Sequence, residues 1–314
     1  MGITEVVIAL AKVFIMILPG YLLSRMGMLK QNHTEALTLI ITTVTYPCLV
    51  IDAMQMEYST EVLNNCKILV VLFFAIISIS LIIAKVIVHF LKLPASQSNI
   101  LAFMMTFGNT GFLGLPVLNG LFGKEAVFYG ALCDSTFDIL MMSVGVMLIR
   151  MAAAGETKMN LAETFKSFVN PCFIGVIIGL ILYICKITLP PIIGGPVASV
   201  GGITSQLAMM VVGAHLGRIR FRDIFTSKYP YLICLLKLLA APALAILLVK
   251  VFIGLGSLFT TVIILESAMP CAMFAVILSA RYKADVEFAT KGVMMTTIVS
   301  LLTIPLVAIA IQYL

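Results

Sequence analysis

Charged residues are scarce in this chain of 314 residues. Asp, Glu, Lys and Arg make up only 11% of it, and 61% of the residues are hydrophobic. Soluble domains carry roughly 25% charged residues, so the composition excludes a water-soluble globular protein. A bilayer core of about 30 Å needs roughly 20 apolar residues per spanning helix. The composition therefore predicts an all-α polytopic membrane protein.

Runs of basic residues are also missing, although the formal net charge is +6. Lys and Arg occur singly or in small groups between apolar stretches, which is not the pattern of a nucleic-acid-binding surface. We therefore expect a lipid bilayer and no nucleic acid as partner. The basic residues instead carry information on membrane topology.

The sequence lacks the common motifs of catalysis. It has no G-x-S-x-G, H-E-x-x-H, G-x-G-D or Walker A pattern, and its seven cysteines show no C-x-x-C spacing. We expect no catalytic residue, no metal site and no cofactor, apart from H⁺ or Na⁺ as a coupling ion. An intramembrane enzyme and an ion channel remain the alternatives to a transporter.

Apolar runs separated by polar, Gly or Pro clusters predict about ten transmembrane helices. Basic residues are unevenly divided between their connections, with fourteen after the odd-numbered spans and four after the even-numbered ones. Cytoplasmic connections are enriched in Lys and Arg, so both termini are predicted to lie outside. The predicted spans are 4–23, 34–54, 67–90, 98–119, 125–150, 170–187, 196–216, 229–252, 257–280 and 286–312.

Five spans precede the longest polar connection and five follow it. An odd number of spans per half reverses the direction of the second half, and such inverted repeats are typical of secondary transporters. We therefore predict a first repeat over residues 1–151, a cytoplasmic midpoint loop over 152–169 and a second repeat over 170–314.

The fourth span is predicted to be a broken helix. It contains Gly108, Asn109, Thr110, Gly111, Gly114 and Pro116 at membrane depth. Glycine and proline disfavour an unbroken helix, and irregular backbone in a bilayer is tolerated only where protein buries it or where it lines a cavity. A binding site is therefore expected here.

The ninth span is predicted to break at Met269, Pro270 and Cys271. Interrupted spans at corresponding places in two inverted halves indicate a site at the membrane midplane. Where two such breaks cross, the amino ends of half-helices bring free N–H groups and positive dipole ends together, which favours an anion. For each proline alone, a simple kink remains the alternative.

The Gly108-Asn109-Thr110-Gly-Phe-Leu-Gly-Leu-Pro116 and Met269-Pro270-Cys271-Ala-Met-Phe-Ala275 segments together resemble the auxin efflux carrier family over essentially the whole chain. The family includes plant auxin exporters and bacterial carriers of organic acids. The resemblance implies a ten-helix inverted repeat, with a scaffold of spans 1, 2, 6 and 7 and a transport domain of spans 3–5 and 8–10. It also implies a homodimer, elevator-like movement and a bacterial inner (plasma) membrane. Asn109 matches the family's crossover asparagine, whereas Cys271 replaces a polar residue of the plant carriers.

Five ionisable residues are predicted near the midplane: Lys12, Asp134, Asp138, Lys237 and Glu266. Each central charge costs about 2.5–3.5 kcal/mol on insertion scales, so they should face the protein interior or water. Asp134 and Asp138 are four residues apart on one helix face and are candidates for a proton or cation site. Lys237 is expected to neutralise an acid, and a purely structural charge network is the alternative.

These features together predict a secondary transporter or facilitator of a small organic anion, a mono- or dicarboxylate such as an auxin-like acid. Gly108, Asn109, Thr110, Pro116, Met269, Pro270 and Cys271 are expected to bind the substrate. Asp134, Asp138, Lys237 and Glu266 are expected to form the coupling or charge network. Tyr46-Pro47 in the second span is expected to be a packing kink, with a role facing the crossover as the alternative.

Overall fold

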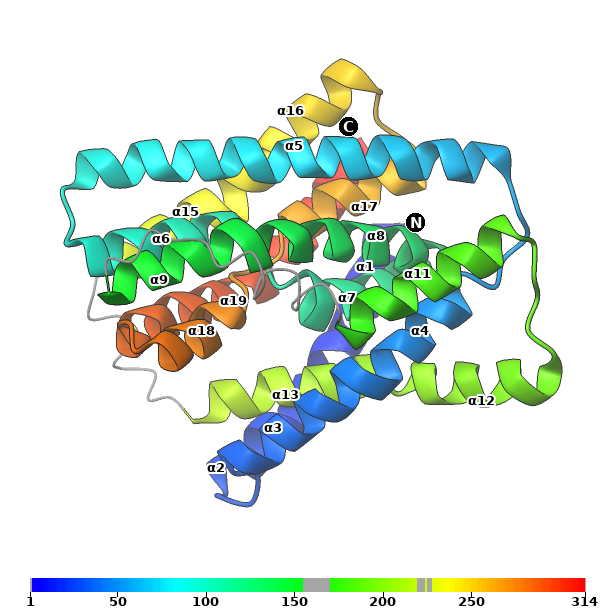
Figure 1. The fold of residues 1–314 in the computed structure, drawn as a ribbon, viewed down its shortest axis with the longest axis horizontal. Coiled ribbons are helices and arrows are strands. Elements are labelled where there is room, and N and C mark those ends of the chain that lie inside the picture. Colours follow the sequence, from blue (N-terminus) through cyan, green and yellow to red (C-terminus); the bar gives the residue numbers. More distant parts are fainter. Residues whose placement is uncertain (1, 155–169, 219–223, 225–227, 314) are drawn as a thin grey trace. The chain divides into compact units, whose positions relative to one another are not determined.

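The computed structural model describes residues 2–154, 170–218, 224 and 228–313 of the chain. Within these residues the regular elements are all helical, and the only β pairing is one isolated bridge (Figure 1). The predicted midpoint loop falls almost wholly outside the described residues, since 155–169 are among those not described. The all-α prediction is confirmed for the described part.

Among the described residues, seven helices are long and apolar enough to cross a membrane. They coincide with the predicted spans 1, 2, 3, 5, 7, 8 and 10, although the third begins earlier than predicted, at Thr60. The prediction of a multi-pass helical membrane protein is therefore confirmed. The seven are Ile3–Arg25, Gln31–Ala53, Thr60–Leu91, Lys124–Ala153, Pro191–Gly217, Tyr229–Phe252 and Val286–Tyr313.

The other three predicted spans coincide with shorter or interrupted helices. The fourth span consists of α6 (Ala95–Thr106) and a helix over Thr110–Phe122. The sixth is α11 (Pro171–Ile184), and the ninth consists of α17 (Leu258–Ser267) and α18 (Phe274–Tyr282). The total of ten spans and the inverted repeat remain predictions.

Several long helices contain a short π-helical segment. Three of these segments have a proline two residues after their last residue, namely Pro47, Pro116 and Pro242. Proline cannot donate a backbone hydrogen bond and clashes with the carbonyl one turn earlier, which widens that turn.

The helices and segments not yet delimited are α1 (Ile3–Ile15), α2 (Ile17–Arg25), α3 (Gln31–Ile40), η1 (Ile41–Thr45), α4 (Tyr46–Ala53), α5 (Thr60–Leu91), η2 (Thr110–Gly114), α7 (Leu115–Phe122), α8 (Lys124–Leu140), η3 (Met141–Gly145), α9 (Val146–Ala154), α12 (Pro191–Gly202), α13 (Thr204–Gly217), α15 (Tyr229–Leu235), η4 (Leu236–Ala240), α16 (Ala241–Phe252), α19 (Val286–Ala310) and η5 (Ile311–Tyr313).

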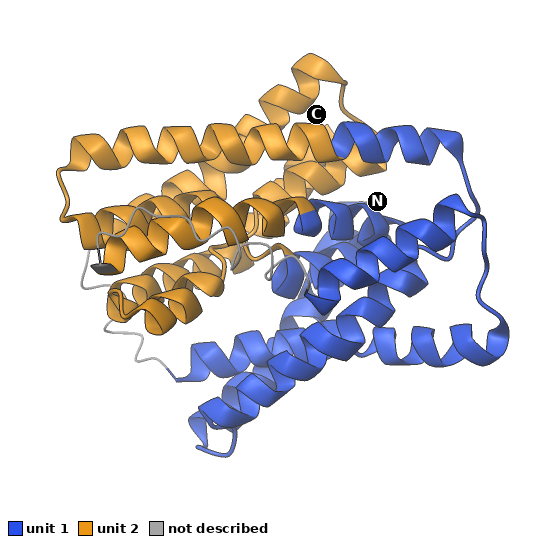
Figure 2. Cartoon of the chain, in the orientation of Figure 1, with its two compact units in different colours: residues 1–69, 111–135, 168–219 blue, residues 70–110, 136–167, 220–314 orange. Residues whose placement is uncertain are grey.

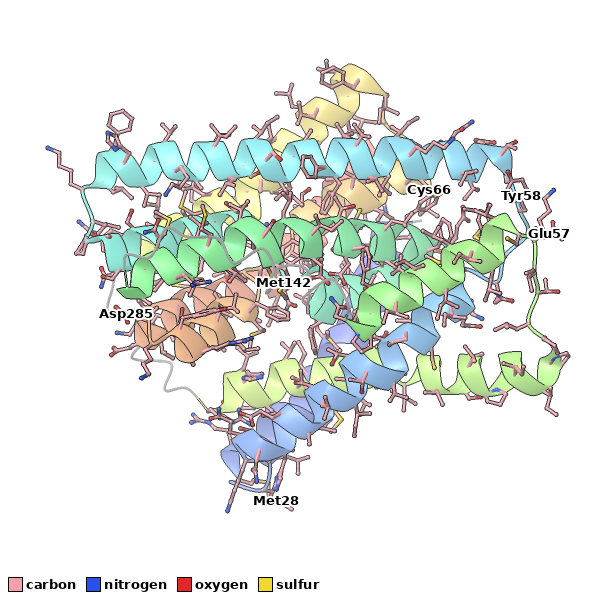
Figure 3. The ribbon with its side chains drawn as sticks, in the orientation of Figure 1. Met28, Glu57, Tyr58, Cys66, Met142 and Asp285 are labelled. Atoms are coloured by element: carbon pink, nitrogen blue, oxygen red, sulfur yellow. The ribbon has the colours of Figure 1, made fainter. Side chains whose placement is uncertain are left out.

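Large apolar side chains are exposed along many helices, as expected of faces that contact lipid. Polar residues such as Glu57 and Asp285 instead lie between helices, at the α4–α5 and α18–α19 connections (Figure 3). This division is the reverse of the surface of a soluble protein and agrees with the membrane assignment.

The chain forms two compact units, and each combines segments from both predicted repeats (Figure 2). Unit 1 comprises residues 1–69, 111–135 and 168–219. Unit 2 comprises residues 70–110, 136–167 and 220–314. The division into repeats 1–151 and 170–314 concerns sequence symmetry and stays a prediction.

Within unit 1, α2 and α13 approach each other closely. A Cβ atom added at Gly20 would lie 1.9 Å from the carbonyl oxygen of Met210, and one at Gly213 would lie 2.0 Å from that of Ile17. Small residues allow such backbone contact between membrane helices, where apolar burial alone gives little driving force.

Within unit 2, the second half of α6 is enclosed by protein. Every residue from Asn99 to Thr106 is buried. The rings of Phe103 and Phe107 pack at a tilt of 46° with centroids 4.9 Å apart, and Phe107 packs edge-on against Phe137 at 5.5 Å. This aromatic packing fixes the carboxyl end of α6, where the helix stops.

We predict that Gly20→Ala lowers the unfolding free energy by about 1–3 kcal/mol, because the new methyl group can fit only if α2 and α13 separate. The thermal unfolding midpoint in detergent measures the change. Gly202→Ala is the matched control, since a Cβ there meets no atom within 4 Å. Equal midpoints for the two variants would contradict the close packing.

Candidate functional site

Two interrupted helices of unit 2 carry most of the predicted site residues. The helix α6 ends at Thr106 and the chain becomes helical again at Thr110. The helix α17 ends at Ser267, and α18 begins at Phe274. The breaks predicted from Gly108 and Pro270 are confirmed, because the backbone there leaves the helical conformation, as at Phe107 with φ −93° and ψ 123°.

The two interruptions pair with each other as a minimal antiparallel bridge between Gly108 and Cys271. The N–H of Asn109 donates to the carbonyl of Pro270 at 2.7 Å, and the N–H of Ala272 donates to the carbonyl of Phe107 at 3.0 Å. We call residues 107–109 together with 270–272 the crossing. Each interruption thus supplies hydrogen-bond partners that the other has lost.

Glycine leaves the most room at position 108, where the crossing is crowded. A Cβ atom there would lie 3.3 Å from the carbonyl oxygen of Met269 and 3.1 Å from Nζ of Lys237. Glycine therefore permits both the close approach of the two backbones and the entry of a lysine side chain.

Cys271 is held in place by two further bonds. Its N–H donates to Oγ1 of Thr296 at 3.2 Å, and its thiol donates to the carbonyl of Met104 at 3.0 Å. Met269 and Cys271 are both fully buried. In this geometry the Cys271 thiol anchors the crossing. No sequence pattern pointed to Thr296 of α19 as the acceptor of the Cys271 N–H.

Asn109 is a predicted site residue whose side-chain amide has no hydrogen-bond partner in the described part of the chain. Only 5% of the Asn109 surface is exposed. An asparagine amide can donate two hydrogen bonds and accept two, and buried amides are almost always paired. An amide in this condition is suited to a ligand.

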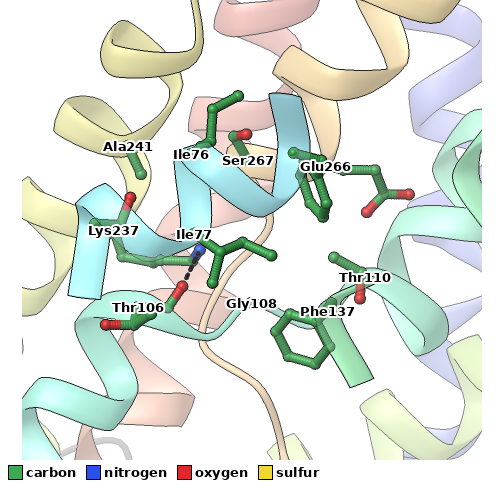
Figure 4. Close-up of a pocket in the computed structure, with 12 residues that line it drawn as sticks. Ile76, Ile77, Thr106, Gly108, Thr110, Phe137, Lys237, Ala241, Glu266 and Ser267 are labelled. Atoms are coloured by element: carbon green, nitrogen blue, oxygen red, sulfur yellow. Dashed lines mark hydrogen bonds between the residues drawn. The ribbon is translucent and has the colours of Figure 1, made fainter. Parts of the chain in front are cut away.

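A polar cavity lies beside the crossing, within unit 2 (Figure 4). Its volume is about 10 Å³, close to the space that one water molecule occupies. Phe73, Ile76, Ile77 and Phe137 supply apolar walls, and the polar lining comes from Thr106, Thr110, Lys237, Glu266 and Ser267. A cavity of this size suits a water molecule or a small ion and excludes an organic anion.

Lys237 and Glu266 are the charged residues of the polar cavity. Lys237 is 4% exposed and Glu266 1% exposed. Nζ of Lys237 donates to the carbonyl of Thr106 at 3.2 Å. In Figure 4 the ammonium lies beside this carbonyl, while the Glu266 carboxylate extends on the side of Thr110. The structure thus brings two of the four predicted network residues into one place.

The two predicted aspartates are placed differently. Asp134 is buried in unit 1, where the hydroxyl of Tyr46 donates to its Oδ2 at 2.5 Å. Asp138 is half-buried, belongs to unit 2 and does not line the polar cavity. Tyr46, expected mainly as part of a packing kink, is therefore a polar partner of a predicted site residue.

Two other predicted residues belong to unit 1, whereas the crossing belongs to unit 2. Pro116 is buried as the second residue of α7, beyond the interruption, and belongs to unit 1. Its effect is on the preceding π-helical segment. Lys12 is exposed on α1, so it does not face the interior of this chain as expected for a charge at the midplane.

Residues that sequence reasoning missed are mostly partners through the backbone or a hydroxyl. Thr106 enters the site through its carbonyl, which the end of α6 leaves without a partner in the helix. The signal for it was its position directly before the glycine-rich break. Ser267, at the end of α17, has the corresponding position in the ninth span.

Comparison with known proteins adds the family. A model of the membrane transport protein family matches residues 5–308. The chain belongs to this family. The resemblance to the auxin efflux carriers is thereby confirmed over nearly the whole chain.

Two relatives of this membrane transport protein come from archaea. One, described as an uncharacterized transporter of Methanocaldococcus jannaschii, is 27% identical over 297 residues, covering 94% of this chain and 95% of the relative. Another, an uncharacterized transporter of Methanothermobacter thermautotrophicus, is 27% identical over 310 residues, covering 98% and 97%. The matches extend along the full relatives, so they concern the whole architecture rather than one motif.

We predict that Tyr46→Phe destabilises the protein by about 1–3 kcal/mol, because the buried Asp134 carboxyl loses a hydrogen-bond donor while the ring packing is retained. Thermal unfolding in detergent is the readout. Tyr313→Phe is the control, since Tyr313 is 73% exposed. If Tyr46→Phe unfolded at the same temperature as the control, the Tyr46–Asp134 hydrogen bond would not contribute to the stability of the fold.

Proposed function

We propose that this membrane transport protein is a secondary transporter or facilitator of a small organic anion, a mono- or dicarboxylate, that works by alternating access. The observation that carries the proposal is the nearly buried, unbonded Asn109 amide at a crossing of two broken helices. Transporter sites of this architecture lie at such breaks. The family membership and the transporter relatives favour this function over an intramembrane enzyme or a channel.

The direction of the helices around the crossing supports an anionic substrate. The helix over Thr110–Phe122 begins directly after Asn109, and α18 begins after Met273. The first four N–H groups of a helix have no partner within it, and its amino end carries about half a positive charge. Two such ends close to one unpaired amide form a site for a carboxylate.

The grouping of helices supports an elevator-like movement. Unit 1 contains the predicted spans 1, 2, 6 and 7, which the family resemblance assigns to a scaffold. Unit 2 contains most of spans 3, 8, 9 and 10 together with the crossing. We propose that unit 2 is the moving domain. One departure is that residues 111–135, parts of spans 4 and 5, group with unit 1.

The proposed setting follows from topology and resemblance. The protein is a multi-pass membrane protein, and we propose a plasma membrane location, bacterial-type, with both termini outside and a homodimeric assembly. The proposed coupling network consists of Asp134, Asp138, Lys237 and Glu266. Transport would be coupled to H⁺ or Na⁺, or would proceed as uniport without a coupling ion.

The test is thermal stability of the purified protein against a panel of small carboxylates and their uncharged amides. A ligand that binds only the folded state stabilises it by RT ln(1 + [L]/Kd), about 2.7 kcal/mol at 100 times Kd. We expect one class of carboxylate, and not its amide, to raise the Tm of the intact protein. Asn109→Ala should lose most of that rise.

Asn64→Ala is the matched control, because Asn64 is exposed on α5. It should respond to the carboxylate as the intact protein does. A panel in which no anion acts, or in which Asn109→Ala responds like Asn64→Ala, would place the substrate elsewhere or make it neutral or cationic.

A further inference from the structure

Two helix carboxyl ends meet at the polar cavity. The helix α6 ends at Thr106 and α17 ends at Ser267, and both residues line the cavity. The last four carbonyls of a helix have no partner within it, and this end carries about half a negative charge. Glu266, in the last turn of α17, adds a carboxylate. The field at this point therefore favours a cation.

The atoms around the polar cavity are those that hard cations select. Thr106 offers a carbonyl, Thr110 and Ser267 offer hydroxyls and Glu266 a carboxylate. Oxygen ligands of these types bind hard metal ions. In transporters with broken helices, carboxyl ends and unwound carbonyls coordinate the coupling ion, whereas amino ends face the substrate.

Lys237 already delivers a positive charge to one of these oxygens, the Thr106 carbonyl. It lies on the π-helical segment η4, and its Nζ donates to the Thr106 carbonyl at 3.2 Å. The absent side chain of Gly108 leaves room for it, since a Cβ there would lie 3.1 Å from Nζ and 3.2 Å from Cε. With the ammonium in place the cavity measures only about 10 Å³. A hydrated sodium ion has no space beside it.

We propose that the Lys237 ammonium is a tethered cation that occupies an oxygen-lined cation site in place of free Na⁺. This inference rests on the proposed transport function, because it concerns the coupling network of that transporter. It implies that transport does not depend on Na⁺. In sodium-coupled carriers a bound Na⁺ supplies the positive charge at such a site, whereas here the Lys237 side chain supplies it. Removal of the side chain should then turn the same oxygens into a sodium site.

The experiment compares the Tm of the full-length protein in NaCl and in choline chloride at equal ionic strength. The intact protein should show no difference. Lys237→Ala should unfold at lower temperature in choline and recover, by at least about 3 °C and saturably, as Na⁺ is added. Lys12→Ala, which removes an exposed lysine of a membrane helix, should behave like the intact protein.

Three further variants keep the test decisive. Lys237→Arg retains a cation and should gain no sodium response, and Lys237→Ala combined with Glu266→Gln should lose the response of the single variant. If Lys237→Ala does not fold in either salt, Lys237→Met keeps the length of the side chain without its charge and takes its place. Stabilisation of the intact protein by Na⁺, or a folded Lys237 variant indifferent to Na⁺, would overturn the proposal.

The outcome is separable from that of the carboxylate panel. A sodium response gained by Lys237→Ala, with no carboxylate effect on the intact protein, would support the tethered cation and remove the anion-transport proposal. A carboxylate effect that depends on Asn109, with no sodium response in the variant, would do the opposite.

Discussion

The structure of unit 2 depends on one backbone pairing, between residues 107–109 and 270–272. Gly108 and Pro270 interrupt two helices where the chain is buried, and an unpaired peptide group away from water costs several kcal/mol. Hydrogen bonds from Asn109 to Pro270 and from Ala272 to Phe107 provide the missing partners. The Cys271 bonds to Thr296 and Met104 then fix the pair to α19 and α6. Without the crossing, neither interruption would be tolerated alone.

The crossing also separates charge. Each broken helix has one carboxyl end and one amino end next to the break, so negative and positive ends are sorted within a few residues. The carboxyl ends of α6 and α17 face the polar cavity with Lys237 and Glu266. The amino ends follow Asn109 and Met273. This sorting is the physical basis for the two proposals, an anion at Asn109 and a tethered cation at Lys237.

The sequence was sufficient to predict the two breaks, because Gly108 and Pro270 act locally on the helix. It also predicted the long apolar helices, whose length and composition are local properties. The register of the crossing could not be predicted, since Gly108 and Cys271 are far apart in the chain and are paired by tertiary packing. The same holds for Lys237, whose partner is a backbone carbonyl, and for the bond between Tyr46 and Asp134. The predicted pairing of Asp134 with Asp138 did not include Tyr46, because i,i+4 spacing shows that two residues share a helix face but not which other residues pack against that face.

Disulfide trapping of the crossing tests its central pairing most directly. Gly108 and Cys271 form the pair between the two hydrogen bonds, where antiparallel Cα atoms are about 4.5 Å apart, within the roughly 4.4–6.8 Å that a disulfide bridges. The variant carries Gly108→Cys, with every native cysteine except Cys271 replaced by alanine. Mild oxidation should form an intramolecular disulfide, measured as loss of thiol labelling and of two hydrogens in mass, and Cys271→Ser should abolish it. If both thiols stay free in the folded protein, the two interruptions do not pair and the account of the site fails.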